Sequence, residues 1–182
     1  MPFENEKKMF LAKIDKSKKG SLDERIIPLF NIINQHPDYH TTSSCSGRVY
    51  FWTGSGKKNE TIWVKVSHDS ITTSFFDFPP QKDIVWLRQE AFILHVACRD
   101  IAAAVQLLDL ARPLFKKSCL LSIRNKIIVE IHGTEILEMP YSKDGVVLYK
   151  GDMEWLVNYI NKKLDRISKS IILFTKKMEL LN

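Results

Sequence analysis

The run from Ala91 to Cys98, Ala-Phe-Ile-Leu-His-Val-Ala-Cys, constrains the fold more than any other stretch of the chain. It is apolar at every position except one and is far too short to cross a bilayer as a helix. Such a run predicts a strand buried on both faces. The exception is His95. A polar group in such a strand is either a hydrogen-bonded core imidazole or a functional side chain aimed into a pocket, and the sequence leaves both readings open.

Hydrophobic periodicity predicts helices and strands around this run. Ser21 and Glu24 form a capping-box pattern, and Pro28 predicts a kink or a delayed start of the helix that follows. Asp100 is expected to cap the next helix. We expect helices over residues 3–14, from about 22, over 101–111 and from Gly151-Asp152 onward, and strands over 49–52, 61–66, 91–98, 118–124, 127–132, 137–140 and 146–149.

This order of elements predicts an α/β (α+β) fold in a single domain over residues 1–182, with a mixed β-sheet of two hairpins flanked by helices. Ser44-Cys45 precedes one hairpin that ends near His68, and Ser118-Cys119 begins another that ends at His132. If this similarity between the two hairpins reflects an internal duplication, it places two similar loops on facing edges of one sheet, with a ligand cleft between them.

The stretch from Thr41 to Arg48, Thr-Thr-Ser-Ser-Cys-Ser-Gly-Arg, has the composition of a ligand-binding loop. It offers hydroxyls, a thiol and backbone N–H groups, while Gly47 allows close backbone approach and Arg48 supplies a fixed cation. The alternative is a Ser-rich turn between a helix and a strand. Its setting among the other polar loops favours the wall of a pocket, in which Cys45 is a small residue of a tight loop.

The chain has a formal net charge of +6 over 182 residues, which favours a polyanionic partner. Its basic loops include Lys19, which lies beside the start of a helix, and Lys116, which lies before a strand. A phosphate could bind at that helix start, or Lys19 could simply be exposed to solvent. The N-terminus lacks the apolar core of a signal peptide, and we expect a cytoplasmic protein. Its three cysteines are odd in number and widely spaced, so we expect free thiols and no metal site.

Several motifs in a fixed order resemble the wybutosine-synthesising tRNA methyltransferase family. They cover nearly the whole chain, although Leu114 and Cys119 stand where that family usually has glycines. The motifs are Lys13-x-Asp15-x-Ser17-x-Lys19-Gly20-Ser21-x-Asp23-Glu24, then Thr41 to Arg48, then Trp63 with Ser67-His68, then Phe92-x-Leu94-His95-Val96-x-Cys98, and then Phe115-Lys116-x-Ser118.

The resemblance implies methyl transfer from S-adenosylmethionine to ring N-4 of the 4-demethylwyosine-type tricyclic base next to the anticodon of phenylalanine tRNA. No G-x-G-x-x-G motif occurs in the chain, so we do not expect the conventional Rossmann methyltransferase fold. The resemblance implies that the protein's partner is the anticodon loop and that it binds neither a membrane nor a metal. We expect a monomer. On this resemblance the expected site residues are Asp23 and His95 for orienting the base or accepting its proton, Ser43, Ser44, Cys45, Ser46, Gly47, His68 and Ser118 for the cofactor, and Lys19, Arg48 and Lys116 for RNA phosphates.

Two other functions compete with this one. The same basic loops would suit a non-catalytic RNA-binding module. A small-molecule hydrolase could use Cys45 as nucleophile with His68 or His95 as base, which requires these side chains to be adjacent in space.

Overall fold

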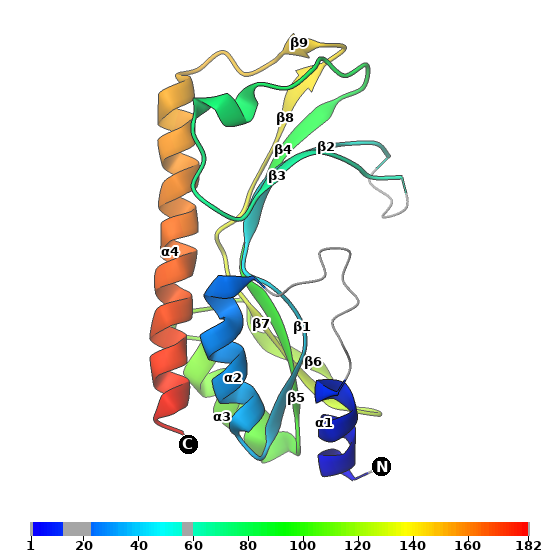
Figure 1. Ribbon diagram of the computed structural model, residues 1–182, viewed down its shortest axis with the longest axis vertical. Coiled ribbons are helices and arrows are strands. Elements are labelled where there is room, and N and C mark those ends of the chain that lie inside the picture. The colour runs from blue at the N-terminus through cyan, green and yellow to red at the C-terminus, as the bar shows by residue number, and fades with distance from the viewer. Residues whose placement is uncertain (1, 13–22, 56–59, 182) are drawn as a thin grey trace. The chain divides into compact units, whose positions relative to one another are not determined.

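The computed structural model describes residues 2–12, 23–55 and 60–181, which form two compact units (Figure 1). The first unit comprises Met1–Ser46, Phe92–Thr134 and Ile167–Asn182, and the second comprises Gly47–Ala91 and Glu135–Arg166. One domain over residues 1–182 stays a prediction.

The first unit is built on a four-stranded antiparallel sheet in the order β1-β5-β7-β6. Its helices are α1 and α2, the 3₁₀ helix η1, α3 and the last turns of α4. The bounds are α1 Phe3–Leu11, η1 Glu24–Ile26, α2 Ile27–Gln35, β1 Tyr39–Cys45, β5 Ile93–Cys98, α3 Ile101–Ala111, β6 Cys119–Ser122, β7 Ile127–His132 and α4 Met153–Glu179. Asp100 caps α3 as predicted, since its carboxylate accepts a hydrogen bond from Ala103 N at 2.8 Å. Pro28 lies in the first turn of α2, which confirms the delayed start of that helix.

One face of this sheet carries the core of the first unit. Leu94 and Val96 of β5 and Ile131 of β7 are fully buried against α2, α3 and the end of α4. The helices contribute the apolar side chains Leu29, Phe30, Ile33, Ala104, Leu107, Ile171, Phe174 and Met178. The prediction that β5 is buried on both faces is therefore wrong at His95, whose side chain is 26% exposed on the opposite face.

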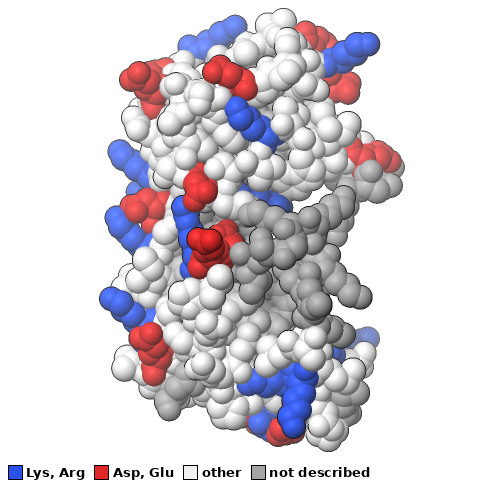
Figure 2. Space-filling model, viewed as in Figure 1, with Lys and Arg blue, Asp and Glu red and all other residues white. Residues whose placement is uncertain are grey.

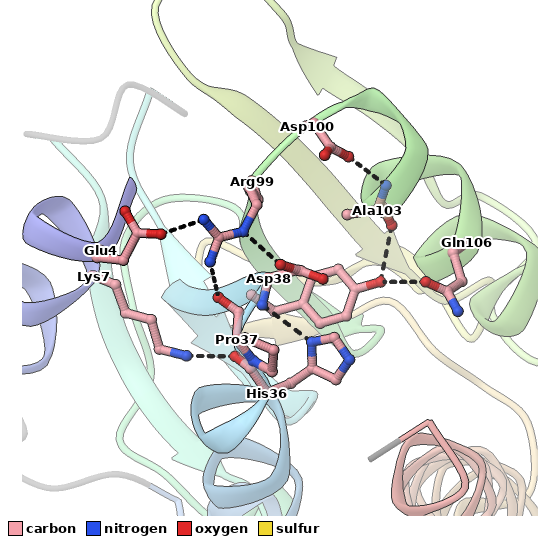
Figure 3. A network of polar contacts seen from close by, with 10 residues as sticks. Glu4, Lys7, His36, Pro37, Asp38, Arg99, Asp100, Ala103 and Gln106 are labelled. Atoms are coloured by element: carbon pink, nitrogen blue, oxygen red, sulfur yellow. Dashed lines mark hydrogen bonds and ion pairs between the residues drawn. The ribbon is translucent and has the colours of Figure 1, made fainter. Parts of the chain in front are cut away.

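On that opposite face α1 is held mainly by polar contacts (Figure 3). Arg99 donates to Glu4 of α1, to Asp38 Oδ1 and to Pro37 O, and Lys7 of α1 donates to a backbone carbonyl. α1 itself has no buried residue, and the rings of its Phe3 and Phe10 each lie 5.2 Å from the ring of His40, so ring contacts and ion pairs together fix its position.

The second unit is built on a five-stranded antiparallel sheet in the order β3-β2-β4-β8-β9. Phe51 of β2 lies at the centre of an aromatic cluster with Phe75, Phe76, Phe78 and Tyr141, which forms the core of this unit. The first turns of α4 cover the same cluster through Leu156, Ile160 and Leu164. The bounds are β2 Arg48–Thr53, β3 Ile62–Ser67, η2 Thr73–Phe76, β4 Val85–Glu90, β8 Leu137–Lys143 and β9 Val146–Val147.

These elements confirm the α+β class and the departure from a Rossmann fold, but correct the single mixed sheet to two antiparallel sheets. Strands joined by short turns pair antiparallel, and a parallel pair needs a long crossover. The α3 crossover leads from β5 to β6, but β7 lies between these two strands, so no parallel pair forms there. The two predicted hairpins, β2-β3 and β6-β7, lie in different sheets, so they do not face each other across one sheet.

No helix within the described ranges is both long and apolar enough to span a membrane.

The buried histidine of β1 makes stability depend on pH. His40 is fully buried between the rings of Phe3 and Phe10, each 5.2 Å away, with Nε2 3.6 Å from Glu6 Oε1. Burial lowers the pKa of His40 below its usual value, and Lys126 adds to this while Glu6 opposes it. Burial also lowers the pKa of His36.

We expect the free energy of unfolding to be constant above about pH 6.5 and to fall as the pH drops below it. The unfolded chain takes up these protons first, because its histidines keep the ordinary pKa of about 6.5. Urea denaturation followed by circular dichroism at pH 7.5 and 5.5 measures the difference. His40→Phe should weaken this dependence and leave the contribution of His36; an unchanged dependence would show that His40 does not cause it.

Candidate functional site

A row of polar side chains crosses three strands on the open face of the first unit's sheet. Ser43 of β1 and Glu130 of β7 lie directly opposite His95 of β5, one on each side. Ser43 Oγ is 2.8 Å from His95 Nδ1, and His95 Nε2 is 2.8 Å from Glu130 Oε2. Antiparallel pairing therefore builds the row, because opposed residues on neighbouring strands point to the same face.

The carboxylate assigns the proton on the imidazole. Ionised Glu130 only accepts hydrogen bonds, so His95 must carry its proton on Nε2 to donate to it. In the neutral ring Nδ1 then keeps its lone pair and accepts from Ser43 Oγ. The arrangement holds a proton acceptor at a fixed place on an exposed face.

Glu130 serves a second imidazole as well. His132 Nδ1 lies 3.3 Å from Glu130 Oε1, the oxygen that His95 does not use. Although this places one carboxylate between two imidazoles, the described residues hold no group of three His, Cys, Asp or Glu side chains suited to a metal ion. The cluster is suited to holding and moving protons.

Sequence reasoning missed Glu130 and His132. Both lie in the strand Ile-Ile-Val-Glu-Ile-His, where the polar residues alternate with buried ones and so share a face. That alternation marks an open face, but only the register of β7 against β5 connects Glu130 with His95.

The stretch from Thr41 to Arg48 is a strand for most of its length rather than a loop. β1 pairs with β5 as far as Cys45, with a bulge between Thr41 and Ser43, because its β-branched and hydroxyl side chains suit a half-buried strand. Ser46 and Gly47 alone connect β1 to β2, and Gly47 has φ 91°, in the left-handed region that glycine adopts without strain.

Three of the predicted ligand-binding residues lie on this strand. Ser43 belongs to the polar row, and Cys45 lies one step along the same face, opposite Ile93. Ser44 pairs with buried Leu94 and so alternates toward the core face. The strand therefore presents every second hydroxyl or thiol to the open face.

Asp23, the other predicted catalytic residue, lies before η1. Its side chain accepts from Arg25 N at 3.5 Å and from Ser46 Oγ. The structure thus joins Asp23 to the end of β1 and joins His95 to Ser43.

Ser118 is buried and closes the turn before β6. Its hydroxyl donates to Phe115 O at 2.6 Å and accepts from His132 N at 3.2 Å. These bonds position the end of β7 that carries His132. His68 lies in the second unit, where its Nδ1 is 3.0 Å from Gly47 O.

The predicted RNA-binding residues fall in different places. Lys19 lies outside the described residues. Lys116 is exposed in the turn before β6 and makes no ion pair within the described part of the chain. Arg48 begins β2 and donates from Nε to Glu90 Oε2 at 2.8 Å.

Net charge is distributed unequally between the two units. The first unit contains 16 Lys and Arg and 10 Asp and Glu, a net charge of +6, whereas the second contains 11 of each and is neutral. Residues 13–22, which lie outside the described ranges, contribute +3 of this excess. On the described part of the face in Figure 2, Asp and Glu side chains lie among the Lys and Arg side chains. Electrostatic attraction to a polyanion resides in the first unit.

The chain is similar in structure and in sequence to several known proteins. The protein is similar to the PH1069 protein from Pyrococcus horikoshii, with a TM-score of 0.88 and 30% identity over 97% of this chain and 96% of that one. A relative from Methanocaldococcus jannaschii is 33% identical over 98% of both chains and is named tRNA(Phe) 7-((3-amino-3-carboxypropyl)-4-demethylwyosine(37)-N(4))-methyltransferase. Another from Pyrococcus abyssi, with the same name numbered 1, is 34% identical over 97% of this chain and 96% of its own.

A relative from Xenopus laevis, named tRNA wybutosine-synthesizing protein 3 homolog, is 34% identical over 94% of this chain and 72% of its own. The family model described as Methyltransferase TYW3 matches residues 5–180, which include both sheets and the whole polar row. The chain belongs to the methyltransferase TYW3 family.

Proposed function

We propose that this protein transfers a methyl group from S-adenosylmethionine to ring N-4 of the 4-demethylwyosine-type base next to the anticodon of phenylalanine tRNA. The names of its relatives support the substrate. The observation that carries the mechanism is the imidazole of His95, held between a hydroxyl and a carboxylate on an exposed sheet face.

The reaction requires a proton to leave as the methyl group arrives. A bond forms between the ring nitrogen and the methyl carbon, the bond from that carbon to sulfur breaks, and the nitrogen's proton must go to an acceptor. His95 Nδ1 is that acceptor, directly or through Ser43 Oγ, and Glu130 stabilises the imidazolium that results. The products are the N-methylated base and S-adenosylhomocysteine.

The side chains around the row suit the donor. S-adenosylmethionine supplies an electrophilic methyl group on a sulfonium, and carries a ribose diol, an ammonium and a carboxylate besides. Glu130 and Asp23 offer carboxylates to cationic groups and hydroxyls, while Ser43 and Ser46 offer hydroxyls to acceptor atoms. Because the chain has no G-x-G-x-x-G motif, binding rests on these side chains and on backbone N–H groups.

A hydroxyl, an imidazole and a carboxylate in sequence also activate serine nucleophiles in hydrolases. Direct methyl transfer needs no covalent enzyme intermediate, so the two roles differ in what Ser43 must do. As a relay, Ser43→Ala keeps a large part of the activity, because water can replace the hydroxyl. The geometry supports the hydroxyl more than the thiol, since His95 Nδ1 lies 2.8 Å from Ser43 Oγ.

The test is incubation with labelled S-adenosylmethionine and phenylalanine tRNA from cells that lack this methylation step. We expect a methylated tricyclic nucleoside on mass spectrometry after digestion. Binding of this RNA by folded protein without transfer would replace the proposal by the non-catalytic RNA-binding module. Unmodified phenylalanine transcript, which lacks the tricycle, is the control and should accept no label.

A further inference from the structure

The outer face of the second unit's sheet carries a group of aromatic rings, of which Tyr50 is 4% exposed and Trp63 is 44% exposed. It lies opposite the Phe51 cluster, because successive residues of β2 alternate between the two faces. The rings of Tyr50 and Trp63 are 4.5 Å apart, and those of Trp52 and Trp86 are stacked at 6.1 Å with an interplanar angle of 17°. We call these four residues, together with Arg48, the aromatic face.

Arg48 is itself part of this stacked arrangement. Its guanidinium lies 4.4 Å from the ring centroid of Trp63 and 5.2 Å from that of Tyr50. Glu90 holds both Arg48 and Tyr50, because its carboxylate accepts hydrogen bonds from Arg48 Nε at 2.8 Å and from Tyr50 Oη at 2.7 Å. The rings and the guanidinium are therefore held in place before any ligand arrives, which lowers the entropic cost of stacking on them.

The most exposed ring of the aromatic face calls for a partner. Trp63 is 44% exposed at an edge strand, so a large apolar surface faces water.

The charges on the aromatic face indicate the chemical class of partner that it binds. Arg48 is paired with Glu90, and Arg88 with Glu90 at 3.6 Å and Glu138 at 3.5 Å, so the charges of these four described side chains cancel. The face therefore cannot attract phosphates strongly. Its carboxylates can accept from exocyclic amino groups, and its rings and guanidinium offer planes on which any base can stack.

We propose that the aromatic face stacks unpaired nucleobases of the substrate RNA. This rests on the proposed function, and it divides the work of RNA binding between the two units. The positively charged first unit attracts the phosphates, and that attraction weakens with salt. The aromatic face binds bases by stacking, which depends little on salt.

Trp63→Ala is expected to weaken binding of a hypomodified anticodon stem-loop about 10-fold to 100-fold, the effect of losing one stacked base. The dependence of log Kd on log salt concentration should keep its slope. Fluorescence anisotropy of a labelled stem-loop at 50 and 200 mM salt measures both quantities. Lys116→Ala is the opposite case: it should weaken binding less and make the slope shallower by about one.

Two further variants separate stacking from folding. Trp63→Phe keeps an aromatic plane and should recover most of the affinity, while Ile62→Ala removes a neighbouring exposed side chain without a ring and should bind as the unchanged protein does. An unchanged affinity of folded Trp63→Ala would overturn the proposal. So would light scattering that shows a dimer which Trp63→Ala dissociates, because the face would then join two copies.

The proposed function is tested separately by methyl transfer. A protein that methylates its RNA while Trp63→Ala keeps the original KM for RNA retains the function and loses the stacking proposal. A protein that binds RNA through Trp63 but transfers no methyl group has the reverse outcome.

Discussion

Replacing His95 by glutamine is expected to lower kcat for methyl transfer by about 10²-fold to 10⁴-fold, the usual contribution of a positioned general base. Glutamine can still hydrogen-bond to Ser43 and Glu130 but cannot accept a proton at neutral pH. The KM for RNA should change little, because the imidazole acts on a proton rather than on the phosphates. Single-turnover assays with saturating labelled S-adenosylmethionine separate this chemical step from product release.

Ser43→Ala and Glu130→Gln are the matched controls for this variant. Both should lose less activity than His95→Gln, because one is a relay that water can replace and the other positions the imidazole. A His95→Gln enzyme with kcat within about threefold of the original would remove His95 as the proton acceptor and direct attention to Asp23. A Ser43→Ala enzyme that loses more than His95→Gln would instead favour a serine nucleophile.

Phe115→Ala is expected to lower the free energy of unfolding by about 3–5 kcal/mol, the range for deleting a buried phenylalanine ring. Phe115 is 2% exposed and lies 4.8 Å from the ring of Phe92 and 5.7 Å from that of Phe174. This loss is a large share of the about 5–15 kcal/mol that a domain possesses. Urea denaturation followed by circular dichroism measures it.

Leu121→Ala is the matched control, since that side chain is 51% exposed on a neighbouring strand. Its free energy of unfolding should stay within about 0.5 kcal/mol of the original. If Phe115→Ala cost as little as Leu121→Ala, the contacts of the Phe115 ring with Phe92 and with Phe174 of α4 would contribute far less than their burial implies.

Local patterns predicted individual elements well because the physics that decides them is local. Asp100, Pro28 and the apolar run of α3 each determine a boundary within a few residues of themselves. The single mixed sheet was wrong because pairing depends on contacts between segments far apart in the chain. Nothing near β6 in the sequence says that β7 will lie between it and β5.

The candidate site was predicted in part for the same reason. His95 stood out because it interrupts an apolar strand, and that signal lies within a few neighbouring residues. Glu130 had no such signal, since a carboxylate in an alternating strand is ordinary. Its role follows from the register that sets it opposite His95, which a single sequence does not contain.

The unequal charge of the two units also implies that RNA binding has two successive steps. Long-range attraction acts before contact, so an approaching RNA meets the field of the first unit while its bases are still beyond the range of any ring. Stacking then decides how long the encounter lasts. The salt concentration should therefore change the association rate constant. Substitution of the tryptophans should change the dissociation rate constant.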